Sequence, residues 1–104
     1  MSTVNLSDYK DLYLQSAREY LESLSKSCEQ LSANLLDKEA LKQLHISSHS
    51  LRSQSQVMGY ANINKLTGVI ENIARDAIVG SIRLTGDIIA DIKKSAKEVE
   101  EMLR

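Results

Sequence analysis

Residues 37–60 read DKEALKQLHISSHSLRSQSQVMGY, a segment with a helix-starting residue at one end and a helix-ending residue at the other. Asp37 is a good N-cap, because its carboxylate can accept hydrogen bonds from the free N–H groups of a first turn. Gly59 can adopt the left-handed conformation that closes a helix. The pattern predicts a helix over residues 38–58, with an inner stripe at three- and four-residue steps made of Leu41, Leu44, Ser48, Leu51, Ser55 and Met58.

The same periodicity precedes this segment. It predicts a first helix over about residues 7–34, with Ser7 or Asn5 as its cap. Its stripe consists of Leu6, Tyr9, Tyr13, Ala17, Tyr20, Leu24, Cys28, Leu31 and Leu35. The tyrosines are expected in the core or at its rim.

Two further helices follow. One is predicted over residues 60–77, opened by Tyr60 and ended by Gly80 and Ser81, with Ile63, Leu66, Ile70, Ile73 and Ala77 facing inward. The other is predicted over residues 86–103 and capped by Thr85, with an inner face made of Ile88 or Ile89, Ile92, Ala96, Val99 and Leu103. Its charged residues, Lys93, Lys94, Lys97, Glu98, Glu100 and Glu101, are expected to form a solvated face.

The connection over residues 78–84 has apolar residues that could form a strand, but a lone strand would have nothing to pair with, so a loop or a frayed helix end is expected. Four helices with short connections and one apolar face each predict an all-α, antiparallel up-down-up-down four-helix bundle. At 104 residues the chain is expected to be one domain, residues 1–104.

Composition narrows the functional classes. The sequence lacks proline, tryptophan and phenylalanine, which disfavours a β-sandwich or small barrel. Lys and Arg number 13 and Asp and Glu number 14, so binding to nucleic acid or an anionic membrane through bulk charge is not expected. A single cysteine, Cys28, allows neither an internal disulfide nor a CxxC metal site. The sequence shows neither a signal peptide nor a membrane-spanning stretch, so a cytoplasmic protein is expected. In that compartment the thiol of Cys28 is expected to be reduced, and its position in a helical pattern predicts that it is buried.

The side chains that could take part in catalysis or phosphate binding are concentrated on the predicted helix 38–58. His45, His49, Arg52 and Gln56 are spaced i, i+4, i+7 and i+11, so they share a face that is not the core face. A neutral imidazole is a nucleophile near pH 7, and a guanidinium one turn away can offset phosphate charge. Two histidines alone are too few ligands for a metal site, and no strand-turn-helix elbow accompanies the neighbouring serines for serine catalysis.

The spacing after His49 resembles the signature of histidine phosphotransfer (HPt) domains. In that signature a histidine is followed after two residues by Lys or Arg, usually then Gly, and later by a Gly and an aromatic residue that opens the next helix. His49, Arg52, Gly59 and Tyr60 take those positions. Residues 9–24 also look like the first helix of the phosphotransfer domain of CheA-type chemotaxis kinases. Glu71 stands where those domains have a glutamate beside the active histidine.

The resemblance implies a phosphocarrier in a two-component or chemotaxis phosphorelay. His49 would take a phosphoryl group on Nε2 from the ATP-dependent catalytic domain of a histidine kinase, and pass it to an aspartate in the receiver domain of a response regulator. Glu71 would orient the His49 ring, and Arg52 would stabilise the phosphoryl oxygens. His45, Ser53, Gln56 and Gly59 are expected on the partner surface. The domain itself would need no cofactor, since ATP and Mg²⁺ would bind the partner domains.

Two positions depart from the family pattern: Ser53 replaces the usual glycine, and Gly68 replaces a histidine one turn before the glutamate. Gly68 is expected to favour local fraying and to leave Glu71 less supported. Both departures support an alternative, a degenerate bundle that only docks a kinase or a regulator. A helix-turn-helix DNA binder is a third possibility, but residues 60–75 offer only Lys65 and Arg75 as cations.

The CheA-like first helix favours a domain cut from a longer kinase over a complete small protein. In either case a monomer is expected for the isolated domain.

Overall fold

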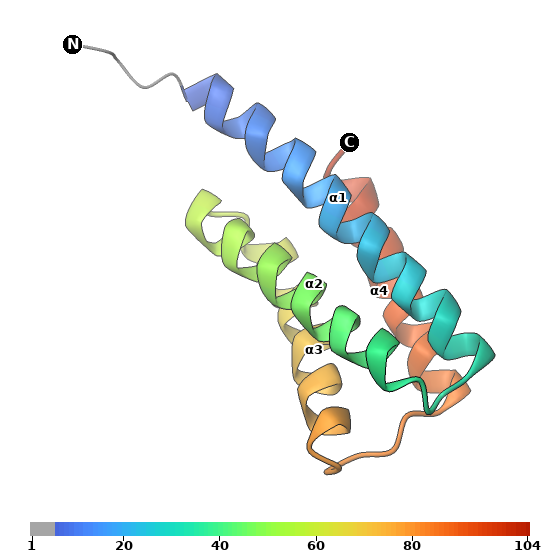
Figure 1. Cartoon of the computed structure of the whole chain (residues 1–104). Helices are drawn as coiled ribbons and strands as arrows, with labels where there is room; N and C mark the ends of the chain where they lie inside the picture. Colours follow the sequence, from blue (N-terminus) through green and yellow to red (C-terminus); the bar gives the residue numbers. More distant parts are fainter. Residues whose placement is uncertain (1–5) are drawn as a thin grey trace.

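The computed structural model describes residues 6–104, and these form four helices (Figure 1). They are α1 (Leu6–Ala33), α2 (Lys38–Met58), α3 (Ala61–Ile78) and α4 (Gly86–Met102). The bounds of every helix lie within one residue of the predicted ones. Asn5, one of the two proposed caps of α1, lies outside the described residues, and Ser7, the other, lies inside the helix rather than before it.

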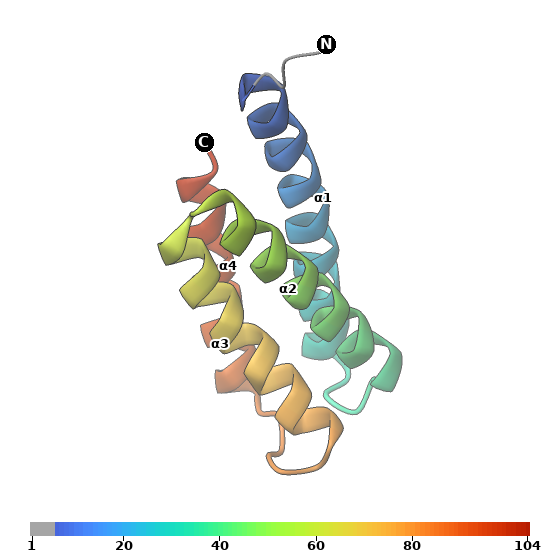
Figure 2. The ribbon, with the colours of Figure 1, turned by 90° about the vertical axis from the view of Figure 1, so that its left-hand side faces the viewer.

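The helices are arranged as a closed four-helix bundle. Among the described residues, the backbone of α1 lies close to those of α2 and α4, and α3 lies close to the same two helices, while the diagonal pairs are further apart. The α1–α2 and α3–α4 connections lie at one end of the bundle, and the α2–α3 turn lies at the other end with the C-terminus (Figures 1 and 2). The predicted antiparallel up-down-up-down topology is therefore confirmed.

The predicted caps set the helix ends. The Asp37 carboxylate accepts a hydrogen bond from the backbone N–H of Ala40 at 3.0 Å, and the Thr85 hydroxyl accepts one from Ile88 at 3.2 Å. Gly59 has a φ of +78°, the left-handed conformation that ends α2. These local interactions explain why the bounds follow so closely from the sequence.

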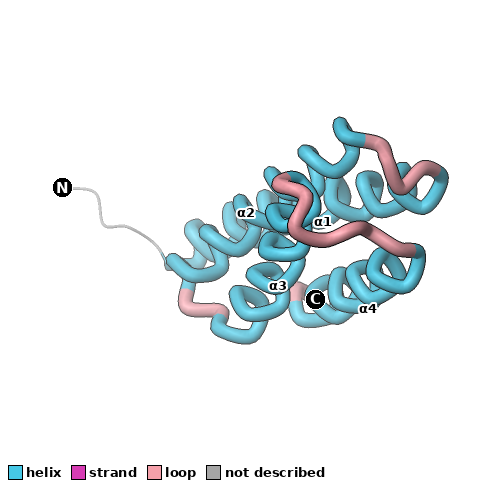
Figure 3. The backbone as a smooth tube through the Cα atoms, turned by 90° about the horizontal axis from the view of Figure 1, so that it is seen from below, coloured by secondary structure: helices cyan, strands magenta, loops and turns pink. Residues whose placement is uncertain are grey.

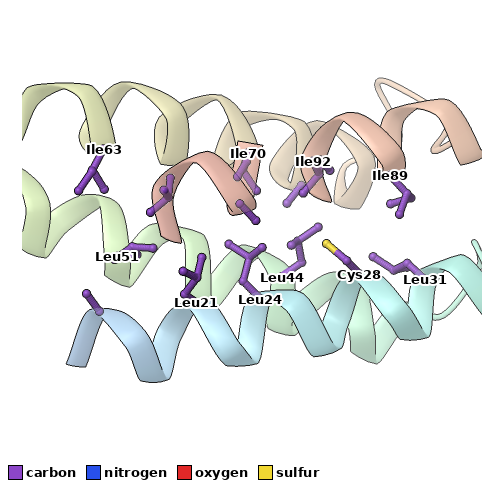
Figure 4. Packing of buried hydrophobic residues seen from close by; sticks show 14 of the residues in the cluster. Leu21, Leu24, Cys28, Leu31, Leu44, Leu51, Ile63, Ile70, Ile89 and Ile92 are labelled. Atoms are coloured by element: carbon purple, nitrogen blue, oxygen red, sulfur yellow. The ribbon is translucent and has the colours of Figure 1, made fainter. Parts of the chain in front are cut away.

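The core is formed by the inner stripes of all four helices (Figure 4). Its largest fully buried side chains are Leu24, Leu31, Leu44, Leu51, Ile70, Ile89, Ile92 and Val99. On α3 the most buried stripe is Ile63, Thr67, Ile70 and Ala74, while Leu66, Ile73 and Ala77 lie at the edge of the core. Cys28 is fully buried, and burial raises the pKa of its thiol to about 11.

Two residues near the ends of the predicted stripe of α1, Tyr9 and Leu35, are exposed, so their predicted burial was wrong. Tyr9 is 51% exposed, because the first turns of α1 extend past the ends of the other helices (Figure 2). Leu35 is also exposed, since α1 ends at Ala33. Tyr13 does reach the core, where its ring stacks on Tyr60 with centroids 5.1 Å apart and its hydroxyl hydrogen-bonds the Ser55 hydroxyl at 2.8 Å.

The α3–α4 connection is a loop, as expected, and it passes across the end of the bundle (Figure 3). One part of the expected solvated face of α4 has a different role. The Lys93 ammonium pairs with the Glu29 carboxylate of α1 at 3.0 Å, so it joins two helices instead of facing a glutamate of its own helix. None of the helices within residues 6–104 has the length and apolar character needed to cross a bilayer.

Candidate functional site

His49 lies in the middle of α2, on its outer side, and its side chain is 61% exposed. Its Nδ1 atom is hydrogen-bonded to the Oε2 atom of Glu71, which comes from the neighbouring helix α3. The predicted pairing of these two residues, 22 positions apart in the sequence, is therefore present.

The Glu71 side chain is only 6% exposed, and both of its oxygens have partners. The Arg52 guanidinium donates from Nη1 to Oε1 at 2.5 Å, while Oε2 contacts His49. Burial alone would raise the pKa of the Glu71 carboxyl, but the hydrogen bonds from Arg52 and His49 outweigh it and hold the pKa below its ordinary value. Glu71 is therefore ionised at neutral pH.

The ionised carboxylate fixes the proton on the His49 ring. A carboxylate can only accept hydrogen bonds, so the His49 Nδ1 atom that contacts it must carry the hydrogen. In the neutral ring the lone pair is then on Nε2, the nitrogen that Glu71 does not occupy. Because the side chain is largely exposed, this arrangement presents a nucleophilic nitrogen to solvent.

Arg52 is held by one face of α3. The Asn64 side-chain amide donates to the backbone carbonyl of Arg52 at 3.2 Å. One turn further along, a Cβ atom added to Gly68 would lie 3.5 Å from the Arg52 Nε atom, so the guanidinium lies directly over that glycine. Asn64 was not among the predicted site residues, although its i, i+4, i+7 spacing with Gly68 and Glu71 places all three on one face.

The expectations attached to Gly68 were wrong. Helix α3 runs unbroken from Ala61 to Ile78, so the structure is regular at the glycine, where fraying was expected. The Glu71 carboxylate is also held in place, because Arg52 donates a hydrogen bond to it in addition to the one from His49.

The residues expected on the partner surface surround the His49 side of α2. Ser53, Gln56 and Gly59 are exposed and His45 is half-buried. The His45 and His49 rings are nearly parallel, with centroids 6.3 Å apart. Within residues 6–104 no three His, Cys, Asp or Glu side chains are grouped as a metal site would require.

An apolar groove lies beside this surface, between the first turns of α1 and the last turns of α2. It is lined by Tyr9, Leu12, Tyr13, Ser16, Ser53, Gln54, Val57 and Met58. Leu12 and Val57 are 61% and 86% exposed, so the groove is open to solvent.

The family model described as "Hpt domain" matches residues 8–103, nearly the whole chain. The chain belongs to the Hpt domain family. The site described above accordingly lies in a histidine phosphotransfer domain, and the predicted family membership is confirmed.

Relatives of this Hpt domain include chemotaxis protein CheA of Bacillus subtilis, which is 21% identical over 101 residues. CheA of Listeria monocytogenes is 23% identical over 93 residues. The two matches cover 97% and 89% of this chain but only 15% of either CheA protein. The chain therefore spans a small part of the length of these curated relatives.

Solved structures agree on the fold. The CheA phosphotransferase domain from Thermotoga maritima superimposes with a TM-score of 0.90 at 24% identity, covering 96% of this chain and 95% of that one. A computationally redesigned four-helix bundle matches with a TM-score of 0.86 at 20% identity, covering 92% and 94%. The Hpt domain thus resembles the CheA phosphotransfer domain in both sequence and architecture.

Proposed function

We propose that His49 is the phosphorylated residue of this Hpt domain, which carries a phosphoryl group from a histidine kinase to a response regulator. One observation carries the proposal: an exposed imidazole whose Nδ1 atom is bonded to a buried, ionised carboxylate. That pairing leaves Nε2 as the nucleophilic nitrogen on the accessible edge of the ring.

In the forward step the Nε2 lone pair of His49 attacks the terminal phosphorus of ATP held by the kinase domain. The new N–P bond forms as the bond from phosphorus to the bridging oxygen breaks, and ADP leaves with that electron pair. The ring becomes positively charged, and the Glu71 carboxylate at Nδ1 offsets this charge. Glu71 therefore has two roles, fixing the tautomer before attack and stabilising the charged ring afterwards.

The return step uses the same geometry in reverse. A carboxylate oxygen of the regulator's aspartate attacks the phosphorus, the N–P bond breaks and its electron pair returns to Nε2. Arg52 would contact the phosphoryl oxygens in both steps. Its side chain is 41% exposed, and among the described residues Glu71 is the one hydrogen-bond partner of the Arg52 guanidinium, so further N–H donors of Arg52 remain for phosphate.

ATP and Mg²⁺ belong to the partner domains in this proposal, and this domain supplies a nucleophile in a fixed pose. The CheA relatives place a domain of this kind within a longer chemotaxis protein. By that likeness, the donor would be a CheA-type kinase domain and the acceptor a receiver domain.

The test is intact-mass analysis after incubation with phosphoramidate, and separately with a CheA kinase domain and ATP. Wild type and His45→Gln should each gain one acid-labile phosphoryl group, and His49→Gln should gain none. His45→Gln is the matched control, because it removes the other imidazole of the same helix face. Failure of folded wild-type protein to gain a group from either donor would favour a module that only docks its partners.

A further inference from the structure

We propose that His45 binds the phosphoryl group on His49: its imidazole takes up a proton from solvent when His49 is phosphorylated, and then donates a hydrogen bond to a phosphoryl oxygen. The proposal rests on the proposed function of His49. It gives a role to the second imidazole of the same helix face, and it makes the persistence of the phosphorylated state depend on pH.

The geometry of the two rings on α2 carries the proposal. His45 lies one turn before His49, and the rings are nearly parallel, with an interplanar angle of 19° and centroids 6.3 Å apart. Glu71 occupies the Nδ1 atom of His49, so a phosphoryl group would be bonded to Nε2. Side chains of a helix lean towards its N-terminus, which brings the His49 ring towards the turn of His45. An N–P bond, a P–O bond and one hydrogen bond of about 2.8 Å together span the separation of the rings.

The His45 ring is available for such a bond. It is half-buried, and among residues 6–104 no group is hydrogen-bonded to it, whereas the His49 ring is bonded to Glu71. The nitrogen atoms of His45 therefore hold no other part of the fold in place.

The charges next to His49 are already balanced before phosphorylation. The Arg52 guanidinium pairs with the Glu71 carboxylate, so one positive and one negative charge offset each other. A protein-bound phosphoryl group adds about two negative charges near pH 7. An imidazolium at His45 would offset part of this added charge, and its partial burial reduces screening by salt.

The other charged groups around His45 come from α2 itself and from α3. Lys42 lies one turn before it on α2. The antiparallel register of the two helices sets Arg75, which follows Glu71 by one turn, opposite His45. Arg75 is 57% exposed and pairs with the Asp76 carboxylate at 3.6 Å. Neither helix thus places an unpaired carboxylate beside His45 among these residues, so its proton is taken up in response to the phosphoryl group.

The first experiment uses wild-type protein and needs no substitution at His45. The ¹⁵N chemical shifts of both histidine rings are recorded at constant neutral pH before and after incubation with phosphoramidate, and intact mass gives the phosphorylated fraction. We expect the His45 nitrogen shifts to move towards those of a charged imidazole as His49 becomes phosphorylated. His49→Gln with the same donor is the control, and its His45 shifts should not move.

The second experiment follows loss of the phosphoryl group from wild type, His45→Gln and His45→Lys. Glutamine keeps an N–H donor but cannot gain a charge, and lysine stays charged throughout. An imidazole titrates near pH 6.5, so His45→Gln should lose the group several-fold faster than wild type at about pH 6 and at the wild-type rate at about pH 8.5. His45→Lys should retain it longer than wild type at the higher pH. Comparing variants at one pH removes the general acid lability of the N–P bond.

The outcomes separate this proposal from the function itself. Unchanged His45 shifts in protein phosphorylated on His49, or equal retention by wild type and His45→Gln at both pH values, would overturn the role of His45 and leave the phosphocarrier function intact. Folded protein that gains no phosphoryl group from phosphoramidate or from a kinase domain with ATP would overturn both proposals. His45→Gln should still gain the group, because His49 supplies the nucleophile.

Discussion

The imidazole of His49 is 61% exposed, while the Glu71 carboxylate bonded to its Nδ1 atom is 6% exposed. The imidazole that we propose to be phosphorylated is thus accessible, and the carboxylate that would orient it is protected from solvent. The difference arises because His49 projects from the outer side of α2, whereas Glu71 belongs to the buried part of the α2–α3 interface.

Replacing Glu71 with glutamine should slow phosphorylation of His49. The amide keeps the shape of the side chain but lacks the negative charge that stabilises the charged ring. We expect a several-fold lower rate with phosphoramidate, measured by intact mass over time. Glu98→Gln, an exposed substitution on α4, is the control and should leave the rate unchanged. Equal rates for the two variants would contradict the role of Glu71.

The Glu71 interactions should also make the stability of the fold depend on pH. Burial alone would raise the pKa of Glu71, but its hydrogen bonds hold it below the ordinary value of 4.5, so the unfolded chain binds the proton more readily than the native protein. The stabilisation is fully present above pH 4.5 and is lost as the pH falls through the lower native pKa. Urea unfolding at several pH values should show the free-energy difference between wild type and Glu71→Gln shrinking on acidification. A difference that is constant with pH would contradict this assignment.

Leu51 lies between the two site residues of α2, and its side chain is fully buried. Leu51→Ala should lower the free energy of unfolding by about 2–5 kcal/mol, because it removes buried methyl groups and leaves a cavity. Leu36→Ala is the matched control, since Leu36 is 82% exposed and its truncation should change stability by less than about 0.5 kcal/mol. Chemical denaturation of both variants checks the prediction.

Gly59 and Gly86 offer a test of backbone conformation alone. An added Cβ would meet no atom within 4 Å at either position, but only Gly59 has a left-handed backbone. Gly59→Ala should therefore destabilise the domain by about 1–2 kcal/mol. Gly86→Ala should leave stability unchanged or raise it by up to about 1 kcal/mol. Thermal unfolding compares the two, and similar effects would refute a conformational cause.

The Cys28 thiol should be inert in the folded domain. It is fully buried with a pKa of about 11, so the reactive thiolate is scarce and inaccessible at pH 8. Iodoacetamide should label it rapidly in denaturant and very slowly in native buffer, as followed by intact mass. Rapid labelling of native protein would show that the α1 interface opens frequently.

The fold could be predicted from the sequence because its determinants are local. Caps such as Asp37 and Thr85 act within one turn, and the apolar stripes reveal each inner face without knowledge of the neighbour. Periodicity does not tell whether a neighbour is present along the whole length of a face. That is why the pattern predicts Tyr9 in the core or at its rim, although the first turns of α1 extend past the other helices.

The site was predictable only in part, for the same physical reason. The spacing of His49 and Arg52 within one helix is visible in the sequence, and a family resemblance was needed to add Glu71. The approach of Arg52 to Gly68 depends on how α2 and α3 pack, so it could not be read from either segment alone. Gly68 was consequently interpreted as a weakness of α3 rather than as space for a neighbouring side chain.

The position of His49 on the outside of a helix has a consequence for the transfer of a phosphoryl group between partner proteins. If His49 is the phosphorylated residue, it would have to enter a cleft of the partner protein, because its exposed side chain on α2 is not enclosed by this domain. The clefts of two different partner proteins could then bind the His49 side chain one after the other, provided that each cleft is wide enough to admit one helix. On this proposal the domain would supply the nucleophile, and the shapes and abundances of its partner proteins would determine which of them receives the phosphoryl group.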